Sequence, residues 1–165
     1  MNTEITKIMH HDYLEVCKMQ SSTATKVWLL TVIFGQNPDT WRVTGVTEAA
    51  LKVFAKHDFK RVSRMGVHRS HLVSRDETYR KMLEKPIEDF DEWWQLYHEN
   101  DKCVLATSGE NNSGRLGKIM PIDVDAGMFR SKGYSWQHRL KVESKFLRKL
   151  YRNNIPSHSS IGKEI

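Results

Sequence analysis

The chain has 165 residues, which is enough for one domain with a substantial hydrophobic core. It contains no apolar run of about 18 residues, no basic start followed by an apolar signal core, and no CxxC or HExxH spacing. The composition therefore argues against a transmembrane helix, a signal peptide and a structural zinc site. We expect a soluble cytoplasmic protein that does not enter a membrane, with Cys17 and Cys103 as buried thiols.

The net charge of +6 comes from the last third of the chain. Residues 111–165 carry eleven basic and four acidic side chains, whereas the preceding residues are nearly balanced. A basic surplus suits a polyanionic partner, and a solvated basic helix followed by a disordered tail is the alternative explanation. We expect nucleic acid as the partner, in the first place double-stranded DNA. The sequence leaves a homodimer open.

Apolar spacing predicts both helices and strands in the first part of the chain. Residues 5–17 have apolar side chains at steps of three and four, which predicts a helix packed by one face. Residues 26–34 form an almost continuous apolar and β-branched run, which favours a buried strand over a buried helix. A short strand at 41–44 should follow, and Thr47 is placed to cap a helix over 48–57.

The rest of the chain alternates between the two kinds of element. Residues 88–98 form a helix with a wide aromatic face, which is typical of core packing. Thr107 and Glu110 have the T-x-x-E spacing of a capping box, which predicts the start of a short helix. We further expect strands over 59–73 (broken at Gly66), 102–107 and 118–124, helices over 77–84 and 136–151, and a loop over 127–135.

These elements predict an α+β fold, with a small mixed or antiparallel sheet and several flanking helices. We expect residues 1–152 to form a single globular domain and residues 153–165 to form a disordered tail. The last helix should present a basic face to the phosphate backbone of DNA. The cations expected on that face include Lys145, Arg148, Lys149 and Arg152.

The stretch from Gly66 to Arg75 concentrates side chains that suit phosphodiester chemistry. It places His68 and His71 close to two arginines, Arg69 and Arg75. Imidazole can transfer protons near neutral pH, and guanidinium matches the shape of a phosphate. His71 is the better candidate for a general base because aliphatic residues follow it and can anchor it. His68 is a candidate phosphate contact.

His71, together with Val104–Thr107 and Glu110–Asn112, resembles the HNH, or ββα-metal, endonucleases of the phage and homing type. In that family a histidine ends one strand of a hairpin, and a later strand leads into a helix that carries metal ligands. The resemblance implies a possible ββα-metal core and a metal-dependent DNA endonuclease. It implies these roles: His71 as general base, Asn111 and Asn112 as ligands of Mg²⁺ or Mn²⁺, and Arg69 and Arg75 on the scissile phosphate.

A second interpretation is a non-enzymatic DNA-binding regulator. Residues 62–75 are similar to the helix-turn-helix of bacterial repressors, with Gly66 in the turn. In that arrangement Arg69, Ser70 and Arg75 would face the major groove. The two interpretations differ in the backbone, since the nuclease needs a strand over residues 67–75 and the repressor needs a helix.

Two further alternatives remain. Asp39, Asp58 and Lys60 have a spacing that PD-(D/E)xK nucleases permit, and the pair Asp123 and Asp125 could share a cation on one face of a strand. In the other alternative, a phage or mobile-element protein uses its basic face to bind another protein. The nuclease and repressor interpretations all require a nucleic acid partner.

Overall fold

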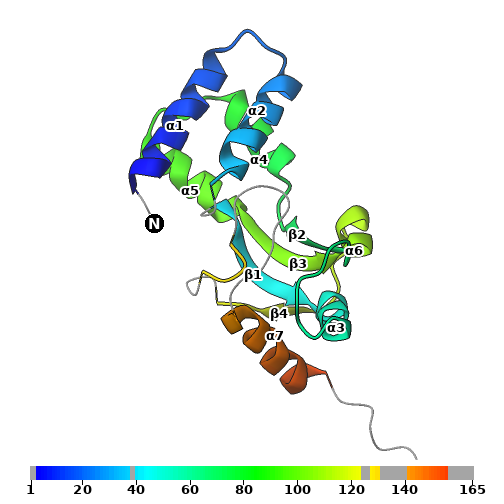
Figure 1. The fold of residues 1–165 in the computed structure, drawn as a ribbon. Helices are drawn as coiled ribbons and strands as arrows, with labels where there is room; N and C mark the ends of the chain where they lie inside the picture. The colour runs from blue at the N-terminus through cyan, green and yellow to red at the C-terminus, as the bar shows by residue number, and fades with distance from the viewer. Residues whose placement is uncertain (1–2, 38–39, 124–126, 131–140, 156–165) are drawn as a thin grey trace, which may run out of the picture.

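The computed structural model of the protein describes residues 3–37, 40–123, 127–130 and 141–155. Within these ranges a four-stranded mixed sheet and seven helices form an α+β architecture, as predicted (Figure 1). No helix in these ranges is both long enough and apolar enough to cross a bilayer. The elements are, in chain order, α1 (Thr3–Lys18), α2 (Thr23–Gly35), β1 (Arg42–Thr47), α3 (Glu48–Lys56), β2 (Val67–His71), α4 (Arg75–Glu84), α5 (Phe90–Asn100), β3 (Lys102–Thr107), α6 (Ser108–Ser113), β4 (Ile119–Pro121) and α7 (Lys141–Asn154).

The sheet has the strand order β2-β3-β1-β4. Strands β1 and β3 are parallel, whereas β2 is antiparallel to β3 and β4 is antiparallel to β1. Because β1 and β3 are parallel, both end at the same edge of the sheet, and each leads directly into a helix. Thr47 caps α3, and Thr107 caps α6 in the predicted capping box. Glu110 accepts a hydrogen bond of 2.8 Å from each threonine hydroxyl and so joins the two helix starts.

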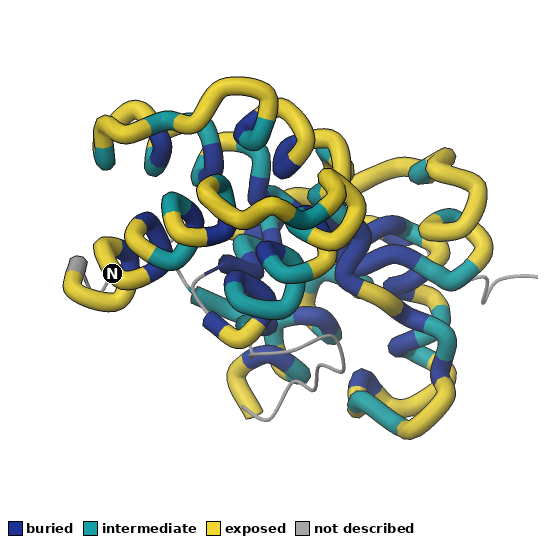
Figure 2. Tube along the Cα trace, turned by 90° about the horizontal axis from the view of Figure 1, so that it is seen from above, coloured by how far each residue is buried: buried dark blue, intermediate teal, exposed yellow. Residues whose placement is uncertain are grey.

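The described residues divide into two halves (Figure 1), and each half has its own hydrophobic cluster. Figure 2 marks the buried residues along the chain in dark blue. In the helical half, α1, α2, α4 and α5 enclose a cluster rich in aromatic side chains around Trp93. In the sheet half, the sheet packs against α3 and α7 around Val46, Leu105 and Leu147. The helical half is built from two separate chain segments, since α4 and α5 are inserted between β2 and β3.

The predicted strand over 26–34 is wrong, because these residues belong to helix α2. Val27, Leu30 and Phe34 are buried at steps of three and four, so the apolar run packs as a helix inside the helical half. Ser22 accepts a hydrogen bond from the backbone nitrogen of Thr25 (3.2 Å) and caps the helix. A run that is apolar on all sides has no clear period, and this cap was the signal that could have identified a helix.

Other boundaries also differ from the predictions. The strand expected over 59–73 begins only at Val67, because Phe59 and Arg64 have φ values of 58° and 59° that an extended strand does not allow. Strand β4 covers only three residues. Helix α7 begins at Lys141 among the described residues, whereas residues 131–140 lie outside them, as does the tail from residue 156 onward.

The helix-turn-helix prediction is wrong as well. Val67–His71 is strand β2 and pairs with β3 along its whole length, from Val67 opposite Thr107 to His71 opposite Cys103. The stretch that should enter a DNA groove as a recognition helix is therefore an edge strand of the sheet.

Candidate functional site

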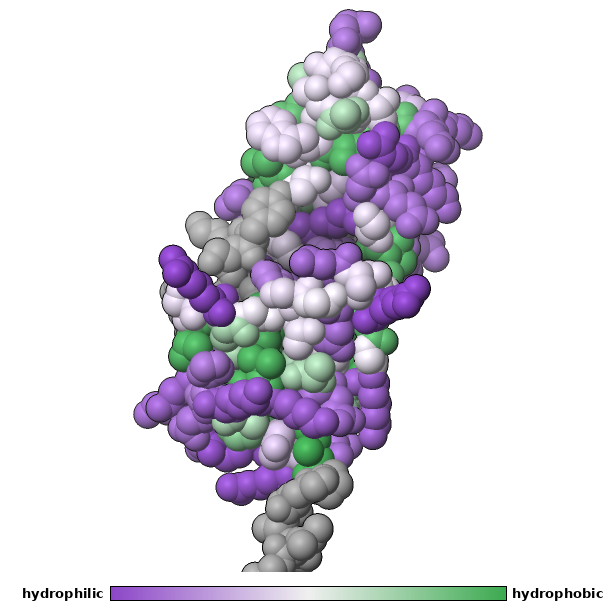
Figure 3. Space-filling view, turned by 90° about the vertical axis from the view of Figure 1, so that its right-hand side faces the viewer, coloured by the Kyte–Doolittle hydropathy of each residue, from purple (hydrophilic) through white to green (hydrophobic). Residues whose placement is uncertain are grey.

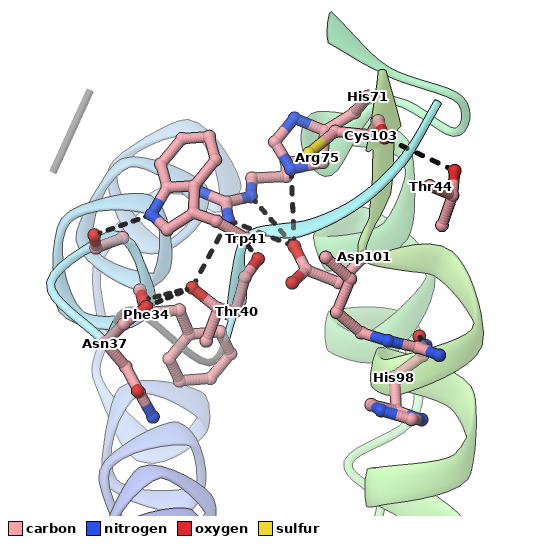
Figure 4. A network of polar contacts seen from close by, with 12 residues as sticks. Phe34, Asn37, Thr40, Trp41, Thr44, His71, Arg75, His98, Asp101 and Cys103 are labelled. Atoms are coloured by element: carbon pink, nitrogen blue, oxygen red, sulfur yellow. Dashed lines mark hydrogen bonds and ion pairs between the residues drawn. The ribbon is translucent and has the colours of Figure 1, made fainter. Parts of the chain in front are cut away.

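The three residues predicted for catalysis lie together where β2 ends and the two halves meet. Asp101, between α5 and β3, is the centre of this group (Figure 4). Its Oδ1 atom accepts hydrogen bonds from His71 Nε2 (3.3 Å) and from Arg75 Nη2 (3.0 Å) and Nε (3.3 Å). Arg75 Nη2 also donates to the carbonyl oxygen of Thr40 (2.9 Å). We call these residues, together with Trp41 and Arg69, the Asp101 network.

Trp41, the residue just before β1, completes the network. The guanidinium carbons of Arg69 and Arg75 lie 3.7 and 3.9 Å from the centroid of its ring, which is the geometry of cation–π contacts. Its Nε1 atom donates to the carbonyl oxygen of Gly35 (3.1 Å) at the end of α2. Burial lowers the pKa of Arg69 to about 10, so this guanidinium is still charged at neutral pH. The indole therefore contacts both halves of the molecule.

The network is almost closed to solvent. The side chains of His71, Arg75 and Asp101 are only 13%, 10% and 2% exposed. Burial of His71, opposed by its hydrogen bond to Asp101, lowers the pKa of the imidazole, and the charges of Arg75 and Arg69 act in the same direction. His71 is then neutral at pH 7 and donates through Nε2, because a carboxylate can only accept. These contacts connect the two halves of the molecule. The role of His71 as a general base stays a prediction.

The lowered pKa of His71 makes a testable contribution to the pH dependence of stability. In the unfolded chain this histidine takes up a proton near pH 6.5, whereas the folded protein takes it up only at lower pH. The free energy of unfolding should therefore fall as the pH is lowered below about 6.5, by at most ~1.4 kcal/mol per pH unit for one group. Urea unfolding of wild type and His71→Gln at several pH values measures this, and equal slopes would contradict the assignment.

The predicted metal ligands lie at the other end of β2. His71 is opposite Cys103 at the start of β3, whereas α6 follows Thr107 at its end, about 13 Å further along the strand. Asn111 and Asn112 are exposed on α6. The histidine close to that helix is His68, whose Nε2 lies 2.8 Å from the hydroxyl oxygen of Ser108. The structure therefore does not bring His71 and the two asparagines together.

The donors near α6 do not fit a Mg²⁺ or Mn²⁺ site. Such ions are held by carboxylates, and the carboxylate on α6, Glu110, already accepts hydrogen bonds from Thr47, Thr107 and the backbone of Gly117. Asn111 and Asn112 are neutral amides. Within the described part of the chain, no group of three or more histidine, cysteine, aspartate or glutamate side chains could hold a metal ion.

The residues predicted to contact DNA on α7 do not all have the same role. Arg148 donates to Asp58 Oδ1 (2.8 Å) and lies over the ring of Phe59, so it attaches α7 to the end of α3. Lys145, Lys149 and Arg152 are exposed. Because Asp58 is paired with Arg148 and with Lys60, it has a structural explanation without a PD-(D/E)xK site. Asp39 and Asp125 lie outside the described residues.

Sequence reasoning missed Asp101, Trp41 and Ser108. Asp101 and Ser108 lie more than twenty-five positions from the β2 residues that they contact, and only the pairing of β2 with β3 brings them there. Comparison with known proteins adds no information about the site, since no family model, curated protein or solved structure matches the chain.

Proposed function

We propose that the protein binds nucleic acid along the phosphate backbone, on the sheet half of the molecule. The observation that carries this proposal is the separation of charge between the two halves. The described residues of the sheet half (41–74, 102–123, 127–130 and 141–155) include sixteen basic and five acidic side chains, a net charge of +11. Those of the helical half (3–37, 40 and 75–101) include seven and twelve, a net charge of −5.

The exposed cations of α7 form a stripe that suits a polyanion. Lys141, Lys145, Lys149 and Arg152 follow one another at steps of four, four and three, which places them on one face of the helix. Leu147 is buried on the opposite side, in the cluster of the sheet half. Figure 3 shows that hydrophilic side chains also cover much of the sheet half on the side of β2 and α6. Exposed lysine and arginine side chains neutralise the phosphates of a bound nucleic acid and release the counterions of those phosphates.

The proposal predicts a salt-dependent interaction that the stripe supports. Replacing Lys145, Lys149 and Arg152 together by glutamine should weaken retention of duplex DNA. It should also make the slope of log K against log salt shallower by about 2.7, if each cation contacts one phosphate. Fluorescence anisotropy of a labelled duplex, at several salt concentrations, measures both quantities.

A matched variant controls for the change in total charge. Lys7, Lys81 and Lys85 are exposed on the helical half, and their replacement by glutamine removes the same number of cations. It should leave the affinity and the slope almost unchanged. Equal losses in the two variants would contradict a specific surface, and retention that does not depend on salt would favour a protein partner over nucleic acid.

A further inference from the structure

We propose that Ser108 and His68 form a catalytic pair that attacks the phosphodiester backbone, with Ser108 as nucleophile and His68 as its base. This inference rests on the proposed binding of nucleic acid and adds a reaction to it. The hydroxyl oxygen of Ser108 lies 2.8 Å from His68 Nε2 and 3.2 Å from the carbonyl oxygen of Gly66. The hydroxyl hydrogen therefore has two acceptors, and the closer one is an imidazole nitrogen that can remove it.

Two backbone segments fix the position of Ser108, namely the start of α6 and the turn at Gly66. Ser108 is the first residue of α6, at the turn that the capping box of Thr107 and Glu110 fixes. Its backbone nitrogen donates to the carbonyl oxygen of Gly66 (2.8 Å). Gly66 has a φ of +70°, and a Cβ atom there would lie 3.3 Å from the Ser108 hydroxyl oxygen. A glycine at this position both allows the turn and leaves room for the hydroxyl.

The pair is open to a large substrate, in contrast to the Asp101 network. His68 is exposed and Ser108 is half-buried. Gly109 is exposed, and apart from its chain neighbours and the backbone of its own helix no described atom lies within 4 Å of the place where its Cβ would be, so the surface next to Ser108 is open. In the loop that follows α6, the backbone nitrogen of Gly117 donates a hydrogen bond to the carboxylate of Glu110 (3.1 Å). The same loop exposes the cations Arg115 and Lys118. These features provide access and positive charge at the same edge of the sheet.

The reaction has two steps. In the first, His68 Nε2 takes the hydroxyl proton, and the bond from Ser108 Oγ to phosphorus forms as the bond to the departing sugar oxygen breaks. That oxygen lies on the side of phosphorus opposite to Ser108 and takes a proton from a water molecule, while His68 stays protonated. In the second step, the hydroxide left by that water molecule attacks the phosphorus of the Ser108–DNA phosphodiester, and the protonated His68 returns its proton to the oxygen of Ser108 as the bond from Ser108 to phosphorus breaks. No electrons are exchanged with another molecule.

A fluorescent fluorophosphonate probe and a labelled DNA duplex test the pair separately. The wild-type protein should be labelled by the probe and should cleave the duplex, as resolved on a denaturing gel. Ser108→Ala should lose both reactions, and His68→Ala should slow both by about 10²- to 10⁴-fold. Ser113→Ala on the same helix and His11→Gln, which replaces an exposed histidine of the helical half, should react at the wild-type rate. His68 is exposed, so its replacement tests the pair even if Ser108→Ala lowers the melting temperature.

The outcomes distinguish this proposal from the binding proposal. A folded wild-type protein that neither reacts with the probe nor cleaves DNA, while it retains the duplex, overturns the catalytic pair alone. Labelling of Ser108 without cleavage of DNA overturns the phosphodiester as substrate. Loss of cleavage in His71→Gln but not in His68→Ala would assign the base to His71 instead. A protein that does not retain DNA contradicts the binding proposal, whatever the probe shows.

Discussion

Replacing Asp101 by alanine should lower the free energy of unfolding by about 3–5 kcal/mol, because it leaves a buried arginine without its counterion. Asp101 is 2% exposed, and its Oδ1 atom accepts from His71 and twice from Arg75. Without the carboxylate, the guanidinium of Arg75 keeps a hydrogen bond to Thr40 and its contact with Trp41. Neither group supplies a negative charge. The loss should therefore exceed that of an ordinary surface ion pair several times.

Urea unfolding followed by circular dichroism measures this loss, and Asp76→Ala is the matched control. Asp76 also pairs with an arginine, Arg80, but both side chains are about half exposed. Solvent screens such a pair, so its removal should leave the free energy of unfolding almost unchanged. Similar losses for the two variants would show that the Asp101 network does not hold the halves together.

Two of the helices that the sequence predicted correctly have a local cap. Helix α3 has a one-sided apolar pattern and Thr47 as its cap, and α6 has the capping box of Thr107 and Glu110. The run over 26–34 has apolar residues on every side, and such a run fits a central strand and a buried helix equally well. The local cap at Ser22 favours the helix, and Phe34 then packs against aromatic side chains of α4 and α5 that lie some fifty residues further along the chain.

In the candidate site, too, only the contacts between residues close in sequence could be predicted. Arg69 and His71 are two positions apart on β2 and share a face of the strand, so their proximity follows from local geometry. The hydrogen-bond partners of His71 and His68 are Asp101 and Ser108, and the register between β2 and β3 brings each partner to its histidine. The charge distribution also could not be predicted from the sequence alone. A count along the chain places the basic surplus in the last third, whereas the fold spreads it over the whole sheet half.

Replacing Trp93, in the aromatic cluster of the helical half, by alanine should lower the free energy of unfolding by about 3–5 kcal/mol. Trp93 is fully buried, and its ring lies 5.6 Å from that of Tyr97, 5.8 Å from Phe34 and 4.9 Å from His10. These neighbours come from α5, α2 and α1, so the indole fills the space where three helices meet. Alanine would leave a cavity that packed rings cannot close.

Trp28→Ala provides the control for this substitution, because it removes the same side chain from the same half of the molecule. Trp28 is 62% exposed on α2, and its loss should change the free energy of unfolding by less than about 0.5 kcal/mol. Urea unfolding should be followed by far-ultraviolet circular dichroism, because each variant lacks one tryptophan and its fluorescence therefore differs from that of the wild type. A loss below about 1 kcal/mol for Trp93→Ala would mean that the helices repack around the cavity. The aromatic cluster would then not be the element that fixes how α1, α2 and α5 pack together.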